Sequence, residues 1–123
     1  MILLDANYIL RFLLKDNLKM YEISKEFIIN HNCIILNEVL AEVVFVLSKV
    51  YNIKKEKIAD ILINFLGCEN IIIDDKLAMI NALKIFKNRN LDFVDCILCA
   101  KSEKYTIKIF DKKLNKCIKN FKA

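Results

Sequence analysis

Four acidic residues stand where a carboxylate is unusual, and they are the side chains of this sequence best suited to chemistry. Asp5 and Asp111 each follow a short apolar run, so both stand at the carboxyl end of a predicted strand. Glu42 and Asp95 each lie within an apolar stretch. A lone ionised carboxylate among apolar neighbours costs several kcal/mol or raises its pKa. Four such acids suggest a shared cation, and an oxygen-only ligand set favours Mg²⁺ or Mn²⁺ over zinc.

Short strands that alternate with helices would position these acids. The apolar runs predict strands at 2–4, 33–36, 71–73 and 106–110, and the helical spacing of apolar residues predicts helices at 6–14, 17–30, 38–51, 54–66, 74–87 and 93–104, with a short one after 110. Asn37, Asp74 and Asp92 are the expected N-caps of three of these helices, and Gly67 is expected to end another. This alternation predicts a parallel sheet covered on both faces, in which ligands bind beyond the carboxyl ends of the strands.

Each acid also has a structural explanation. Asp5 and Asp111 can cap the helices that follow them, and Asp95 falls at the third position of its helix, where a negative charge suits the helix dipole. Glu42 is harder to explain, because it is mid-helix, its neighbours at −3, +3 and +4 are apolar, and no Lys or Arg lies three or four residues away. Taken together, the four acids favour a metal site. Asp92 is expected mainly as a helix cap beside it.

Composition excludes several other classes of protein. A chain of 123 residues with 56% hydrophobic residues, one Gly and no Pro is expected to be one globular domain over 1–123. A single Gly rules out both common phosphate-binding glycine motifs, and a single His leaves no evident Ser-His-Asp triad. The longest uncharged stretch, 27–37, is shorter than the ~18 residues of a membrane span. The start does not read as a signal peptide, so we expect a cytoplasmic protein whose five cysteines are packing residues rather than a disulfide framework.

The positive charge is concentrated near the end of the sequence. The net charge is +5, and residues 101–123 carry eight lysines against two acids. These lysines can be the solvated face of a last helix or an end that attracts phosphate, and the two roles can coexist.

Around the four acids the sequence resembles the PIN-domain proteins, of the type found as VapC toxins in toxin–antitoxin pairs. The resemblance rests on four short motifs in the family's order: Leu4-Asp5-Ala6-Asn7-Tyr8-Ile9-Leu10-Arg11, Val39-Leu40-Ala41-Glu42-Val43-Val44-Phe45-Val46-Leu47, Leu91-Asp92-Phe93-Val94-Asp95-Cys96-Ile97-Leu98-Cys99-Ala100 and Ile109-Phe110-Asp111. It implies an α/β fold, a three-layer α/β/α sandwich with a parallel sheet of four to five strands in the order 3-2-1-4-5.

The resemblance also implies a function. Family members are metal-dependent endoribonucleases, usually homodimers, that a cognate antitoxin holds inactive. By carry-over, the acidic quartet that binds Mg²⁺ or Mn²⁺ is Asp5, Glu42, Asp95 and Asp111, with Asn7 and Asp92 close by. Arg11, Lys15, Lys112 and Lys113 are the candidates for guiding the RNA backbone.

Three positions depart from the family pattern. Ala6 and Ile109 replace hydroxyl residues that often flank the first and last acids, and Lys113 stands where a further Asp is common. Lost hydroxyls weaken the groups that orient metal ligands. An ammonium at 113 either binds phosphate or disfavours a second metal.

The leading hypothesis is therefore metal-assisted hydrolysis of RNA by a toxin ribonuclease. One alternative is a catalytically weak PIN-like module that binds RNA or a protein. A more distant one is a phosphoacceptor or phosphatase domain that uses Asp5 as its nucleophile, although dehalogenase-like enzymes carry an Asp where this chain has Asn7.

Overall fold

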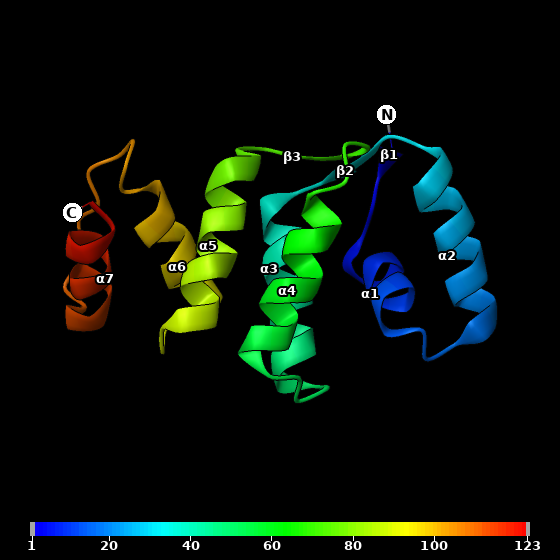
Figure 1. The fold of residues 1–123 in the computed structure, drawn as a ribbon, viewed down its shortest axis with the longest axis horizontal. Coiled ribbons are helices and arrows are strands. Elements are labelled where there is room, and N and C mark those ends of the chain that lie inside the picture. Colours follow the sequence, from blue (N-terminus) through cyan, green and yellow to red (C-terminus); the bar gives the residue numbers. More distant parts are fainter. Residues whose placement is uncertain (1, 123) are drawn as a thin grey trace.

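The computed structural model describes residues 2–122. Its elements lie in an elongated row, with α2 at one end and α7 at the other (Figure 1). In chain order they are β1 (Ile2–Leu3), α1 (Ala6–Leu14), α2 (Leu18–Asn30), β2 (Cys33–Ile35), α3 (Asn37–Lys49), α4 (Lys55–Leu66), β3 (Ile71–Ile73), α5 (Lys76–Asn88), α6 (Phe93–Lys101) and α7 (Lys112–Lys122).

The sheet is small and parallel. Its strands run in the order β1-β2-β3, with Ile2 opposite Cys33 and Ile34 opposite Ile72. The predicted parallel pairing of these three strands is confirmed. The described chain is helix-rich, however, and its sheet has three strands rather than the four or five expected.

The prediction of a fourth strand at 106–110 is wrong for this structure. These residues belong to no helix or ladder in the part of the chain that the structure describes. They lead into α7, which packs against α6 at the end of the molecule remote from β1 (Figure 1). Phe110 is fully exposed, and the outer edge of β1 has no strand beside it in residues 2–122.

Polar side chains begin most of the helices, although two predicted caps are displaced. Asn17 caps α2, Asp92 caps α6 as predicted, and Gly67 ends α4 as predicted. Asn37 is the first residue of α3 rather than its cap, because the extended residue before it is Leu36, which has no capping oxygen. Asp75, in a left-handed conformation, caps α5 in place of Asp74.

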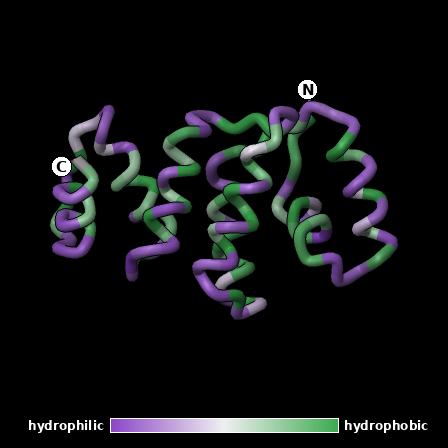
Figure 2. Tube along the Cα trace, in the orientation of Figure 1, coloured by the Kyte–Doolittle hydropathy of each residue, from purple (hydrophilic) through white to green (hydrophobic). Residues whose placement is uncertain are grey.

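The core is formed by the inner faces of the helices and by β2 and β3. Figure 2 shows apolar and polar residues alternating along the helices, as expected for helices with one buried stripe. The largest fully buried side chains include Ile9, Leu40, Leu47, Leu62, Met79 and Leu83. No helix within residues 2–122 is long and apolar enough to cross a membrane.

Two cysteines depart from the expectation that they serve only as packing residues. Cys99 on α6 and Cys117 on α7 form a disulfide bond, and both are buried. The expectation was wrong for this pair because residues 18 apart in sequence are brought together by the packing of α7 on α6. Cys33, Cys68 and Cys96 are free thiols.

Candidate functional site

Asp5 lies at the carboxyl end of β1, as its sequence position predicts. Its Oδ1 accepts a hydrogen bond of 2.8 Å from the Tyr8 N–H, so it is the N-cap of α1. The side chain remains exposed, and so does that of Asn7. Asp5 also borders a hollow of about 390 Å³ beside the open edge of β1, lined by Leu3 and Phe27 among others. Capping uses one carboxylate oxygen, which leaves the other for a ligand.

Two further acids stand at the start of α6. Asp92 is the N-cap, and its Oδ1 accepts a hydrogen bond of 3.0 Å from the Asp95 N–H. Asp95 is half-buried at the third helical position. Burial raises the pKa of the Asp95 carboxyl, and the negative charges of Asp92 and Asp111 raise it further. The start of α6 therefore holds negative charge that is stabilised by protonation or by a cation.

Asp111 comes close enough to Asp95 to act on its ionisation, although the two are far apart in sequence. Its Oδ1 accepts a hydrogen bond of 2.8 Å from the Leu114 N–H at the start of α7. Lys112 and Lys113 follow in the first turn of α7 and are exposed. The negative charges of Asp92 and Asp111 thus both act on Asp95.

Glu42 lies on the outer face of α3, and the prediction that it sits on a buried apolar face is wrong. Its side chain is exposed. The buried stripe of α3 consists of Leu40, Val43, Val44 and Leu47. The prediction considered only the apolar neighbours of Glu42 at −3, +3 and +4, whereas the charged residues Glu38, Glu42 and Lys49 share one side of α3 and mark it as the outer side.

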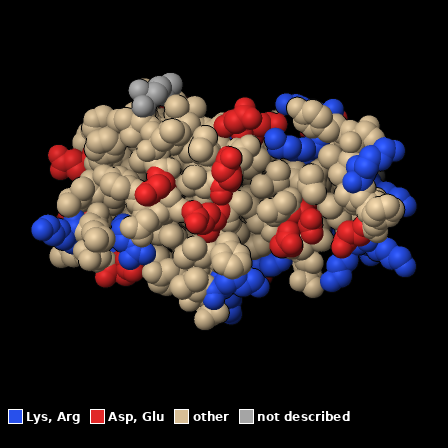
Figure 3. All heavy atoms as spheres, turned by 180° about the vertical axis from the view of Figure 1, so that it is seen from behind, with Lys and Arg blue, Asp and Glu red and all other residues tan. Residues whose placement is uncertain are grey.

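The candidate acids do not close into a metal-binding cluster within residues 2–122. Acidic side chains gather across the middle of the face seen in Figure 3, and basic ones crowd the end where α7 lies. Within residues 2–122, no three His, Cys, Asp or Glu side chains are grouped closely enough to hold a metal ion. The chemistry of the donors suits Mg²⁺ or Mn²⁺, since every candidate ligand is a carboxylate, but the four ligands are not assembled in this conformation.

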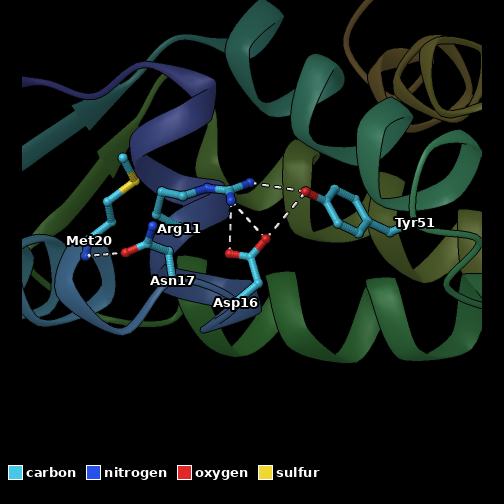
Figure 4. Close-up of polar contacts among 5 residues, drawn as sticks. All are labelled: Arg11, Asp16, Asn17, Met20 and Tyr51. Atoms are coloured by element: carbon cyan, nitrogen blue, oxygen red, sulfur yellow. Dashed lines mark hydrogen bonds and ion pairs between the residues drawn. The ribbon is translucent and has the colours of Figure 1, made fainter.

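Arg11 is engaged inside the protein. Its Nη1 donates to both carboxylate oxygens of Asp16, at 2.8 and 2.7 Å, and its Nη2 donates to the Tyr51 hydroxyl at 3.1 Å (Figure 4). The Tyr51 hydroxyl and the Asp16 carboxylate raise the pKa of the guanidinium against a smaller opposing effect of burial. Lys15, by contrast, is exposed, with its Nζ 5.3 Å from the centre of the Tyr21 ring. An RNA phosphate would reach Lys15 freely but would have to displace Asp16 from Arg11.

One feature near the acids was not predicted from the sequence. A groove of about 570 Å³ runs between α3 and the segment that leads into α6, and Phe45, Lys49, Asp92 and Val94 line it. Phe45 is 60% exposed. In the sequence Phe45 is one residue of a long apolar run, and the signal that could have found it is its spacing of three residues from Glu42 and four from Lys49.

One known protein family matches the sequence of the chain. The model of the PIN domain matches residues 2–116, which is nearly the whole chain. The protein belongs to the PIN domain family. No curated protein and no solved structure matches the chain.

Proposed function

We propose that this PIN domain is a metal-dependent endoribonuclease that hydrolyses RNA phosphodiester bonds, and that it is the toxin of a type II toxin–antitoxin pair. PIN domains are generally nucleases, often within toxin–antitoxin systems. The observation that supports the proposal is the Asp95 carboxyl at the start of α6, whose pKa is raised by burial first and then by the negative charges of Asp92 and Asp111. Negative charge held together in this way is typical of sites that bind a cation or move protons.

The proposed ligands of Mg²⁺ or Mn²⁺ are Asp5, Glu42, Asp95 and Asp111. When bound, such an ion lowers the pKa of a water molecule and neutralises charge on the phosphate. The carboxylates orient the attacking water and accept its proton, while Asn7 and Asp92 hold neighbouring ligands in place. Lys112 and Lys113, next to Asp111, attract the RNA backbone. The proposal requires Asp5 and Glu42 to come closer to the Asp95 group than they are here.

Cleavage of a mixed cellular RNA pool tests this directly. We expect the purified protein to cut RNA with Mn²⁺ or Mg²⁺, and expect EDTA or Asp95→Asn to reduce cutting by at least about 100-fold. Glu69→Gln is the matched control, because it neutralises an exposed acid on the loop before β3. Cutting that survives both EDTA and Asp95→Asn would contradict the mechanism.

A second candidate function is a PIN-like module that binds RNA without cutting it. The observation in its favour is that no metal cluster is assembled among residues 2–122, together with the loss of hydroxyls at Ala6 and Ile109. Intact RNA, saturable RNA binding and no metal binding in a calorimetric titration would select this alternative.

The proposed partners are an antitoxin protein and a second copy of the chain. A toxin acting on cytoplasmic RNA should arrest growth when it is expressed alone, and co-expression of a small DNA-binding protein from the neighbouring reading frame should relieve the arrest. Arrest by the Asp95→Asn variant as strong as that by the wild type would argue against toxicity through cleavage.

A further inference from the structure

The outward side of α3 carries a single stripe of functional side chains. Glu38, Glu42, Phe45 and Lys49 are all exposed, and their spacing of four, three and four residues places them along one side of the helix. One stripe thus changes from two carboxylates to an aromatic ring and then to an ammonium group. Glu42 is already a proposed metal ligand, so the ring and the ammonium lie next to the proposed site.

The exposed ring of Phe45 borders a groove. A single exposed apolar side chain is ordinary on a protein surface. Phe45, however, forms a wall of the 570 Å³ groove, and Val94 on the α6 side of the same groove is 57% exposed. Asp92 lines this groove too. The groove therefore begins beside the proposed site at Asp92, and exposed apolar side chains line it farther from that site.

The far wall of the groove is held in place. The Lys55 ammonium donates hydrogen bonds of 2.9 Å to the carbonyls of Arg89 and Leu91 and lies 4.6 Å from the centre of the Phe86 ring. These contacts fix the segment before α6, and they leave Lys55 itself occupied. The cation at the open rim is Lys49, which forms no ion pair within residues 2–122.

We propose that this groove binds an unpaired nucleotide of the RNA substrate, with the base stacked on Phe45 and a phosphate at Lys49. The inference rests on the proposed function and adds two residues of this chain, Phe45 and Lys49, as the contacts that hold one unpaired nucleotide in the groove. Stacking on aromatic rings and pairing of phosphates with lysine are the two main contacts of proteins with single strands. A base in an A-form duplex is stacked and paired, so it cannot reach Phe45.

A fluorescent reporter at the groove tests the proposal without cleavage. The chain contains no Trp, so Phe45→Trp places the sole indole at the proposed stacking position. The matched control is Tyr105→Trp, since both Phe45 and Tyr105 are 60% exposed and Tyr105 does not line the groove. Both are made in the Asp95→Asn background and titrated with a single-stranded RNA hexamer, or with the same sequence in a duplex, in EDTA.

We expect saturable quenching of the indole at 45 by the single strand, much weaker quenching by the duplex, and little change at 105. In the same background, Phe45→Ala should weaken single-strand affinity about 10-fold. Lys49→Ala should reduce the salt dependence of binding by about one phosphate contact. Circular dichroism checks that each variant is folded.

Three outcomes would overturn the proposal: equal quenching at 45 and 105, equal affinity for single strand and duplex, or unchanged affinity in Phe45→Ala. The last would show that Phe45 makes no stacking contact with the RNA. The proposed function has a separate readout, because quenching at 45 with no metal-dependent cutting by the wild type supports this inference and contradicts the nuclease. Metal-dependent cutting by the wild type without quenching at 45 would support the nuclease and contradict this inference.

Discussion

Asp95 shows how a side chain can serve a site at a cost to the fold. Its pKa is raised by burial first and then by Asp92 and Asp111, so the folded state holds this proton more tightly than the unfolded state does. Stability is therefore lost as pH rises from the unfolded pKa, near 4, through the raised folded value. At neutral pH the ionised carboxylate lowers the free energy of unfolding, and a bound cation would offset this loss.

Asp95→Asn should for this reason abolish cutting without lowering stability. The amide removes the repulsion, although it also gives up a favourable charge in the first turn of α6. We expect Tm at pH 7 to be unchanged or raised by roughly 2 °C, and any gain to shrink as pH falls toward about 4, where the carboxyl becomes protonated in the unfolded chain as well. Thermal melts of both proteins across this pH range measure the effect. A gain that grows as pH falls would contradict the assignment.

The free cysteines should differ sharply in reactivity. Burial raises the pKa of the Cys96 thiol to about 12 and also raises that of Cys33, and both side chains are buried, whereas Cys68 is exposed. Since the thiolate is the reactive form, iodoacetamide at pH 8 should label Cys68 alone in the native protein. Mass spectrometry of tryptic peptides reads this out, and the unfolded, unreduced chain should take up label at all three thiols. Rapid native labelling of Cys96 would contradict the packing of α6.

At the scale of elements, the polar contacts of Arg11 join three segments. The guanidinium binds Asp16, in the turn between α1 and α2, and Tyr51, just beyond α3. A planar guanidinium presents its donors in a fixed fork, which allows two hydrogen bonds to Asp16 and a third to Tyr51, whereas a lysine ammonium lacks this fork.

Arg11→Lys should therefore destabilise the protein despite keeping the charge. The Arg11 and Asp16 side chains are 18% and 38% exposed, so we expect a modest loss of about 1 kcal/mol, measured by urea unfolding. Lys19→Met is the control, because it removes an exposed cation from α2. Equal stability of Arg11→Lys and wild type would show that this contact contributes little.

The helices were the most predictable part of the fold, and α3 shows where prediction stops. The bounds of α1 follow directly from the spacing of its apolar residues and from Asp5 as cap. In α3 most residues are apolar, and the signal that places Glu42 and Phe45 outside and Val43 and Val44 inside is the alignment of charged residues on one side of the helix. The apolar neighbours of Glu42 at −3, +3 and +4 hide this signal, because they lie on or beside that same outer side.

At the scale of the whole molecule, the sheet has an open edge. β1 pairs only with β2 within residues 2–122, and Leu3 is 61% exposed. Open edges favour pairing with another chain unless charge blocks it. If the proposed homodimer forms through this edge, Leu3→Lys should shift it toward monomer in sedimentation velocity at matched concentrations. Leu77→Lys, at 68% exposure on α5, is the control. Association of Leu3→Lys equal to wild type would exclude this edge.

The candidate acids stay a prediction, and the structure does not assemble them within residues 2–122. The sequence singles out Asp5 and Asp111 by apolar runs before them and Asp95 by its apolar setting, and all three lie at helix starts. Distances between them depend on where 106–111 runs after α6. That path depends on long-range packing, including the placement of α7. An apolar run in the sequence does not predict such packing.

The disulfide between Cys99 and Cys117 spans the exposed connection between α6 and α7. Lys108 is exposed within that connection, in extended chain that a protease can bind. A single tryptic cut there would leave two polypeptides covalently joined, so the nicked protein would weigh one water more than the intact chain until a reductant released the α7 fragment. Limited digestion with and without reductant thus tests, without any RNA, whether the disulfide joins α6 to α7.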